Sequence, residues 1–240
     1  MRTFVILAAA FPLIACNVMA DNDRPGVAGT GSGTTRTYAV ADFTKVALRG
    51  SDDIDVRVGT AFSVRAEGDA EVLDYLKIEK DGDTLKVGRR NRDGFNWGGK
   101  SAKIYVTMPR IAAGSVAGSG DLAIDRAEGA GFEASTAGSG NIAVATLAVD
   151  SADFSIAGSG SIAAGGTAKA VNASIAGSGD IDAKRLKASG AEVSIAGSGS
   201  VAIDVTGNAK VSIVGSGDAD LGKGAKCSTS KMGSGTVTCG

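Results

Sequence analysis

The residues best placed to do chemistry are those that directly follow Gly-Ser-Gly triplets, which recur at regular intervals along the 240-residue chain. The seven positions after the triplets hold Asp121, Asn141, Ser161, Asp180, Ser200, Asp218 and Thr236. Glycoside hydrolysis needs two carboxyl groups roughly 5 to 10 Å apart. If the triplets stack at about 4.8 Å, Asp180 and Asp218 lie about 10 Å apart, with no second base or arginine clamp beside them. A polysaccharide-active enzyme is therefore the weakest of three functional hypotheses, and we assign no catalytic residue.

Metal, cofactor and nucleic-acid functions find little support in the sequence. Calcium-binding β-rolls need a nine-residue period with an acid in nearly every turn, whereas here an acid follows three of seven triplets. The chain contains no histidine, which excludes Ser-His-Asp and Cys-His triads and most zinc sites. Its net charge of −1 gives no electrostatic preference for nucleic acid. We expect no metal, no cofactor and no nucleic-acid partner.

A second candidate site is the segment 89–100, RRNRDGFNWGGK, in which cations lie beside two aromatic rings. Charge and aromatic stacking together suit an anionic or glycan ligand. The candidate contact residues are Arg89, Arg90, Arg92, Phe95, Trp97 and Lys100. Two interpretations stay open: a glycan-binding loop, or a solvated hairpin connection whose aromatic side chains cover the end of the core. We favour the hairpin.

The first 20 residues have the composition of an export signal, with one arginine followed by an apolar stretch too short for a permanent membrane span. The letters LIAC that end at Cys16 match the bacterial lipobox, in which the cysteine is lipidated and becomes the mature N-terminus. Ordinary cleavage after Ala20 is the alternative. Asn17 favours transfer to the outer membrane, where a lipid anchor would hold the protein stably. Residues 21–37, polar and rich in glycine and threonine, predict a flexible linker.

The two cysteines that remain after signal processing, Cys227 and Cys239, predict a disulfide because an even pair in an exported protein is usually bridged. Its position predicts a pin on the final turn of the fold. A redox-active thiol pair is the alternative, but the C-x-x-C spacing of such pairs is missing.

The triplets establish a repeat. They begin at Gly118, Gly138, Gly158, Gly177, Gly197, Gly215 and Gly233, with steps of 20, 20, 19, 20, 18 and 18 residues. The residues between them alternate between apolar and small polar types, which indicates strands. Short strands joined by glycine corners bury their apolar side by stacking, so residues 115–240 predict a parallel β-helix about 29 Å long from first to last triplet.

Residues 38–114 predict a more irregular β part before the array. Four segments alternate in the manner of strands: 53–59, 62–68, 84–90 and 102–109. Between the second and third of these, Asp69 is placed to cap one helical turn, and the Asp81-Gly82 pair to make a tight turn.

The order of these segments, from FTKVALRGSDDIDVRVG through IYVTMPRIAAGSVAGSGDLAI to the later GSG repeats, resembles the bacterial head GIN domain family of auto-transporter adhesin heads. The resemblance covers residues 39–237. It implies a right-handed β-helix similar in shape to pectin lyases but without their catalytic residues, and a role in adhesion or envelope architecture.

The leading functional hypothesis is therefore a non-enzymatic, exported envelope lipoprotein with an adhesion or scaffold role, partnered by the outer membrane through its anchor. A periplasmic or secreted protein is the alternative location. A glycan-binding module that uses the 89–100 loop or the post-triplet row is the alternative function.

Overall fold

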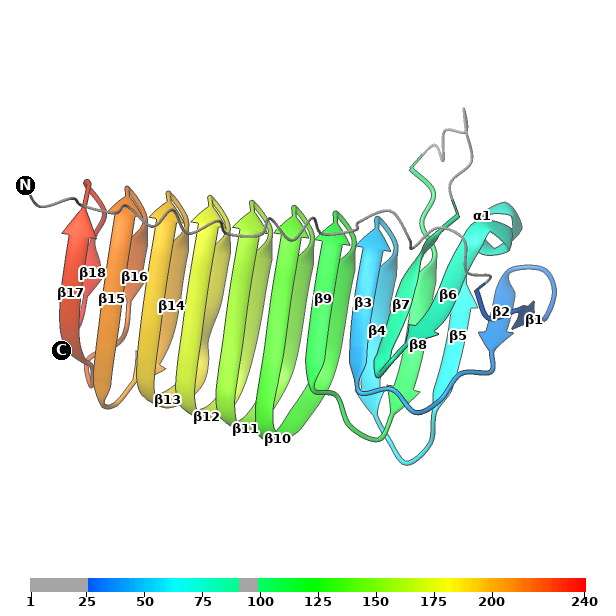
Figure 1. Ribbon diagram of the computed structural model, residues 1–240, viewed down its shortest axis with the longest axis horizontal. Helices are drawn as coiled ribbons and strands as arrows, with labels where there is room; N and C mark the ends of the chain where they lie inside the picture. Colours follow the sequence, from blue (N-terminus) through cyan, green and yellow to red (C-terminus); the bar gives the residue numbers. More distant parts are fainter. Residues whose placement is uncertain (1–25, 91–98) are drawn as a thin grey trace, which may run out of the picture.

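The computed structural model describes residues 26–90 and 99–240, which form one elongated β-solenoid with a capped end (Figure 1). The predicted export signal and Cys16 lie outside the described residues, as do Arg92, Phe95 and Trp97. Within the described residues, no helix has the length and apolar character that a membrane span requires.

The repeats form the solenoid as expected, each contributing one rung of parallel strand. Four rungs are continuous strands that pair in register with their neighbours: β10 (Asp121–Gly138), β11 (Asn141–Gly158), β12 (Ser161–Gly177) and β13 (Asp180–Gly197). The later rungs are divided into β14 (Ser200–Val205), β15 (Asn208–Gly215), β16 (Asp218–Asp220), β17 (Lys226–Met232) and β18 (Val237–Thr238). The predicted all-β solenoid with a period of about 20 residues is thereby confirmed.

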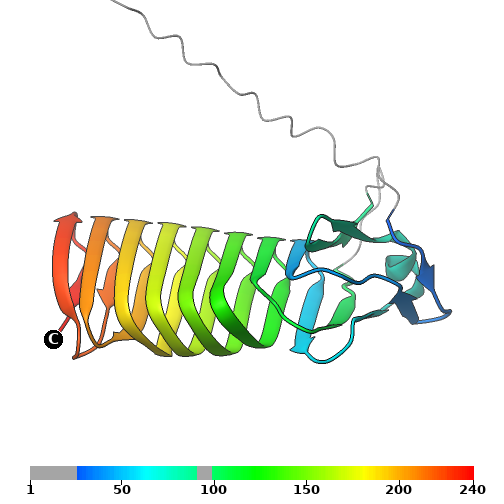
Figure 2. The same cartoon turned by 60° about the horizontal axis from the view of Figure 1, so that its bottom comes forward.

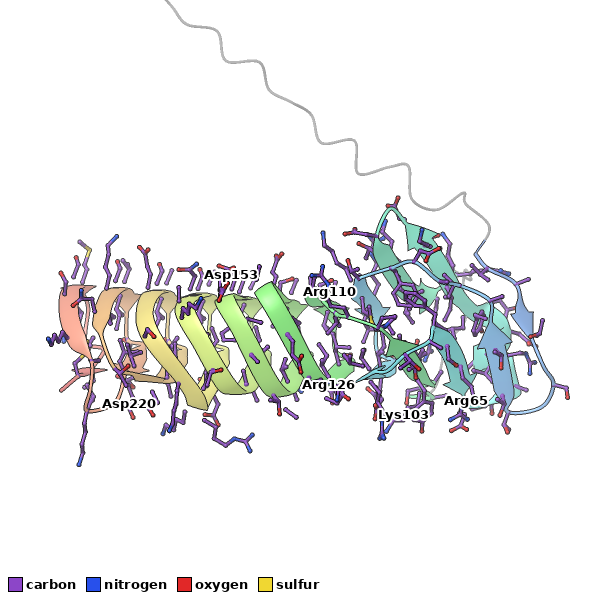
Figure 3. The ribbon with its side chains drawn as sticks, turned by 90° about the horizontal axis from the view of Figure 1, so that it is seen from below. Arg65, Lys103, Arg110, Arg126, Asp153 and Asp220 are labelled. Atoms are coloured by element: carbon purple, nitrogen blue, oxygen red, sulfur yellow. A yellow bond between two sulfur atoms is a disulfide. The ribbon has the colours of Figure 1, made fainter. Side chains whose placement is uncertain are left out.

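Each long strand bends midway, so the solenoid has two sheets that face away from each other (Figure 2). The segments before the Gly-Ser-Gly corners stack into one sheet, whose outward side we call the serine face. The segments after the corners stack into the second, whose outward side we call the opposite face. Figure 3 shows Asp153 on the first and Asp220 on the second.

The solenoid begins earlier than the predicted boundary at residue 114. β3 (Lys45–Gly50) pairs in parallel with β9 (Ala113–Gly118), and β4 (Asp53–Val58) pairs in parallel with β10. Residues 45–58 are therefore a first rung, and the division into 38–114 and 115–240 needs correction. The signal in the sequence is Gly50-Ser51-Asp52, a corner in which aspartate replaces the last glycine.

Beyond this rung, mixed strands close the N-terminal end of both sheets. They are β5 (Ser63–Glu67), β6 (Leu76–Asp81), β7 (Thr84–Arg89) and β8 (Lys103–Met108). The helix α1 (Ala70–Tyr75) covers this end, and the Asp69 carboxylate accepts a hydrogen bond from the N–H of Glu71. The four expected strands, the single helical turn and its cap are confirmed.

The predicted linker at residues 21–37 is too long. β1 (Gly29–Thr30) pairs with β2 (Thr35–Tyr38), and β2 pairs with β5, so this segment extends the sheet. Tyr38 is buried, which secures the segment to the core. Glycine and threonine content indicated flexibility, but β-branched threonines also suit an edge strand with a turn made by Gly31 and Gly33, both at positive φ.

The core consists of apolar columns that run along the solenoid axis. One column holds Ile142, Ile162, Ile181 and Val201, each at most 1% exposed and in register with the next. Burial of each such side chain contributes about 1.5 to 3 kcal/mol. Because every rung contacts mainly the rungs beside it, stability is built from neighbour contacts along the stack.

The last rung breaks the apolar pattern. Three strand positions of β17 that continue the columns of Ala209, Val211 and Ile213 hold Cys227, Thr229 and Lys231. Cys227 is bonded to Cys239, which confirms the predicted disulfide. Lys231 donates to the carbonyl of Gly235 at 2.7 Å. Polar groups and a covalent bridge thus cover the end of the core, where an exposed apolar edge would invite aggregation.

Candidate functional site

The repeated corner is a structural device in which the two glycines have different tasks. The first glycine adopts positive φ, as in Gly158 at 128°, which L side chains rarely tolerate. The second glycine points into the stack: a Cβ on Gly160 would overlap the carbonyl oxygen of Gly140. The serine between them is exposed, and the N–H of Ser159 donates to the carbonyl of Gly138 at 2.8 Å.

The residues after the corners, which carried the enzymatic hypothesis, form a ladder of hydrogen bonds along the solenoid. Oδ1 of Asp121 accepts from the N–H of Asn141 at 3.2 Å, and Oδ1 of Asn141 accepts from the N–H of Ser161 at 3.1 Å. Oδ1 of Asp180 accepts from the N–H of Ser200 at 3.0 Å. Asp53 and Asp218 do the same for Asp121 and Thr236.

Where the residue after the corner is a serine, the N–H of the equivalent residue in the next rung donates to a glycine carbonyl instead. The N–H of Asp180, above Ser161, donates to Gly160, and the N–H of Asp218, above Ser200, donates to Gly199, each at 3.2 Å. The side chain of aspartate or asparagine is longer than that of serine, so its Oδ1 can accept a hydrogen bond from the N–H of the next rung. This use of Asp180 and Asp218 differs from the converging acid and base of a glycosidase.

The basic and aromatic loop divides into residues with separate roles. Arg89 forms a two-pronged ion pair with the buried carboxylate of Asp52 and also donates to the carbonyl of Lys100 at 2.9 Å. Its side chain is 11% exposed, so Arg89 is a structural residue and its predicted ligand contact needs correction. Arg90 is exposed, and the Lys100 ammonium lies 3.1 Å from the Asp69 carboxylate. The hydrogen bond from Lys100, together with the N–H of Glu71, lowers the pKa of Asp69.

The serine face is a feature that sequence reasoning missed. One column of exposed or half-buried side chains in register across seven rungs consists of Ser115, Ser135, Ser155, Ser174, Ser194, Ser212 and Ser230. The column beside it consists of Ala117, Ala137, Ala157, Ala176, Ala196, Val214 and Met232. The signal was present: a serine stands three residues before the first glycine of every triplet.

A third column gives the serine face its charge. It contains Ala113, Glu133, Asp153, Asn172, Glu192, Lys210 and Ser228 in register. Depressions of about 430 and 490 Å³ lie along this column. Asp153 accepts from the Asn172 amide at 2.6 Å, and Lys210 lies 2.9 Å from Glu192. In the described part of the chain, no group of three or more acidic or cysteine ligands is arranged to hold a metal ion.

The opposite face has a depression of about 360 Å³ at its N-terminal half. Its floor is made by small side chains that include Ala123, Ala143 and Ala163. Asp55, Arg57 and Asp125 border it on the side of the first rungs, and Arg185 borders it further along the stack. The depression therefore combines a methyl-rich floor with charged walls of both signs.

Comparison with known proteins agrees with this architecture. Residues 42–224 match the family described as "Putative auto-transporter adhesin, head GIN domain". The chain belongs to the head GIN domain family. Membership and the solenoid fold support a non-enzymatic, adhesin-like role, and they point to the cell surface or envelope. The sequence matches no curated protein.

Solved structures similar to this chain show the same fold. A "putative adhesin" from Bacteroides fragilis NCTC 9343 is 24% identical with a TM-score of 0.78, over 85% of this chain and 95% of that one. A "Putative lipid binding protein" from Parabacteroides distasonis ATCC 8503 is 27% identical with a TM-score of 0.67, over 88% and 98%. A "putative adhesin" from Parabacteroides merdae ATCC 43184 is 21% identical with a TM-score of 0.66, over 90% and 99%.

Proposed function

We propose that this head GIN domain protein is an exported lipoprotein of the outer membrane that acts in adhesion or as an envelope scaffold, without catalysis. The observation that carries the proposal is the serine face: seven rungs of short side chains held in register on a rigid stack. Such a face suits contact with a broad surface better than it suits enclosure of a small substrate. The hydrogen-bonded ladder after the corners supports the same view, because it commits the aspartates to the fold.

The anchor in this proposal is Cys16, supported by the LIAC letters and by the export signal around it. The test compares the wild-type chain with Cys16→Ala in a bacterial host, by acyl labelling and by the distribution of the protein between membrane and soluble fractions. We expect Cys16→Ala to lose both the label and the membrane fraction. Unchanged labelling and partitioning would contradict the lipid anchor and leave cleavage after Ala20.

The adhesive role has its own test. Cells that display the wild-type chain should attach to one another or to a host surface more than cells that display no head GIN domain protein. Replacing Ala157 by arginine on the serine face should reduce attachment, because the guanidinium interrupts the flat surface. The matched control is Ala202→Arg, which lies on the opposite face outside its depression. Equal attachment by both variants and the wild type would contradict the role of the serine face.

Glycan binding is a second candidate function, favoured by the depression on the opposite face, whose methyl floor and charged walls suit a linear saccharide. A glycan array read with the wild type, with Arg57→Ala plus Arg185→Ala, and with Trp97→Ala separates the two proposed locations. Loss of a specific signal in the arginine variant alone assigns the depression, and loss with Trp97→Ala alone assigns the loop at residues 89–100. Absence of any specific signal with the wild type would reject this candidate.

A further inference from the structure

We infer that the serine face binds the serine face of a second copy of this chain, with the two solenoid axes antiparallel. This inference rests on the proposed adhesive function, for which it names the partner. The size of the face, the side chains that protrude from it and the distribution of its charges support such a pairing.

The face is large enough for a weak, reversible homodimer. When six of the seven rungs overlap, five steps of about 4.8 Å give a length of about 24 Å, and the four outward columns that begin at the alanine column span about 20 Å. Contact over this rectangle buries roughly 480 Å² on each copy, about 1,000 Å² in total, which is the size of a weak or transient interface. Its alanine and serine side chains are short, so two such sheets can approach closely over their whole length.

The protruding apolar side chains are concentrated at one end of the face. Val214 is 55% exposed and Met232 is 73% exposed, and they are the large apolar residues that stand out to solvent among the described residues. Both belong to the alanine column, in its last two rungs, and they are neighbours in register. An antiparallel partner places Val214 over Ala157 and Met232 over Ala137, where the methyl side chains leave room.

The charges are distributed unevenly along the same axis. Glu133 and Asp153 lie in the N-terminal half of the face, whereas Lys210 and Lys226 lie near its C-terminal end, where Lys210 also pairs with Glu192. A parallel pair of faces would put each rung against the same rung of the other copy, so the carboxylates of both copies would lie in the same half of the interface. The antiparallel pair with its two-fold axis between the rungs of Asn172 and Glu192 puts Asp153 opposite Lys210. It puts Glu133 opposite Ser228, with Lys226 two residues away in the same rung. Exposed ion pairs add little affinity, but they select orientation.

The two protruding side chains thus favour the antiparallel orientation, and the charges select the register. In this register each contact between two rungs occurs twice, once in each direction, as a two-fold interface requires. Near the axis, the hydroxyl of Ser174 faces Ser194 of the other copy and Ser194 faces Ser174. Farther out, Ser135 and Ser155 face Ser230 and Ser212, so they do not meet each other. This difference provides a direct test.

The test uses cysteine cross-linking of the full chain under mild oxidation, read on a non-reducing gel. Each cysteine is introduced alone, because two cysteines in neighbouring rungs of one copy, about 4.8 Å apart, would form a disulfide within that copy. A mixture of the Ser174→Cys and Ser194→Cys proteins should form a covalent heterodimer, because these two positions meet across the axis. The matched control, a mixture of the Ser135→Cys and Ser155→Cys proteins, should stay monomeric. Equal cross-linking in both mixtures would overturn the antiparallel register, and no cross-linking in either would overturn the homodimer.

A second measurement keeps the inference independent of cysteine chemistry and of the lipid anchor. Sedimentation velocity should show a monomer and dimer equilibrium that Lys210→Glu weakens at least tenfold and that Lys210→Glu plus Asp153→Lys restores. Ala202→Arg on the opposite face should leave the equilibrium unchanged. A wild type that remains monomeric at high concentration contradicts the homodimer and leaves heterotypic adhesion possible, so the two proposals fail separately.

Discussion

Arg89 and Asp52 form a two-pronged ion pair at the first corner of the solenoid, where Nε of Arg89 lies 2.8 Å from Oδ2 of Asp52. Asp52 is fully buried, and its Oδ1 also accepts from the N–H of Ala102 at 2.7 Å. It takes the place that the second glycine holds in the later corners. The pair therefore fastens the first rung to the segment that returns from the 89–100 loop.

Removing the arginine should destabilise the whole protein, because it leaves a buried carboxylate without its counter-charge. We expect Arg89→Met to lower the free energy of unfolding by about 3 to 5 kcal/mol, the usual cost of breaking a buried ion pair. Chemical denaturation measures it. Arg90→Met, at an exposed neighbour, should change stability by less than about 0.5 kcal/mol. Similar losses in both variants would indicate that the loop, and not the pair, carries the effect.

At the second glycine of a corner, substitution by a residue with a side chain should destabilise the protein. Gly160→Ala places a methyl group against the carbonyl of Gly140, so we expect a loss of about 1 to 3 kcal/mol from overpacking. Thermal unfolding followed by circular dichroism measures it. Ser159→Ala in the same corner should be nearly neutral because its side chain is exposed. A stable Gly160→Ala protein would contradict the close stacking of the corners.

The ladder after the corners predicts that an acceptor matters more than a charge. Asp180→Ala removes the acceptor for the N–H and hydroxyl of Ser200 and should cost about 1 kcal/mol. Asp180→Asn retains a carbonyl oxygen, as Asn141 does naturally, and should cost less than half as much. Denaturant melts of the two variants decide the point. An equal loss in both would favour a role for the negative charge.

The disulfide should act locally. Cys227→Ser plus Cys239→Ser opens a loop between residues 12 apart, worth about 3 kcal/mol in the chain-entropy model. Because rungs are stabilised by their neighbours, the loss should appear as fraying of the last rung. Hydrogen exchange should accelerate in β17 and β18 while β11 keeps its protection. Uniform acceleration along the solenoid would show that the bridge supports the entire stack.

The sequence predicts the solenoid well because its rules are local and repeated. Alternation sets the strands, and glycine at 18 to 20 residue steps sets the corners, so β10 to β13 follow without long-range information. The first rung was missed because Asp52 replaces a glycine and because β3 and β4 pair with strands more than 50 residues away. Pairing between such distant segments produces no periodic pattern in the sequence.

The candidate sites were harder to predict for the same reason. Arg89 appeared available in a basic loop, but its partner, Asp52, stands 37 residues earlier in the chain. From the sequence, the aspartates after the corners are candidate catalytic residues. The register of the strands shows that they accept hydrogen bonds from the next rung. The serine face depends on which side of a strand each residue takes, and this follows from the register of seven rungs together.

The cap of α1 predicts a pH dependence with a defined sign. The hydrogen bonds from Lys100 and Glu71 lower the pKa of Asp69 below 3.8, so the stabilisation by its carboxylate is complete above that value and is lost as the pH falls through the lower, folded pKa. Asp69→Asn still caps the helix but does not titrate. The difference in melting temperature between wild type and Asp69→Asn should therefore be constant from pH 7 to about pH 5 and shrink at about pH 3 and below. A difference that grows on acidification would contradict the interaction of Asp69 with Lys100.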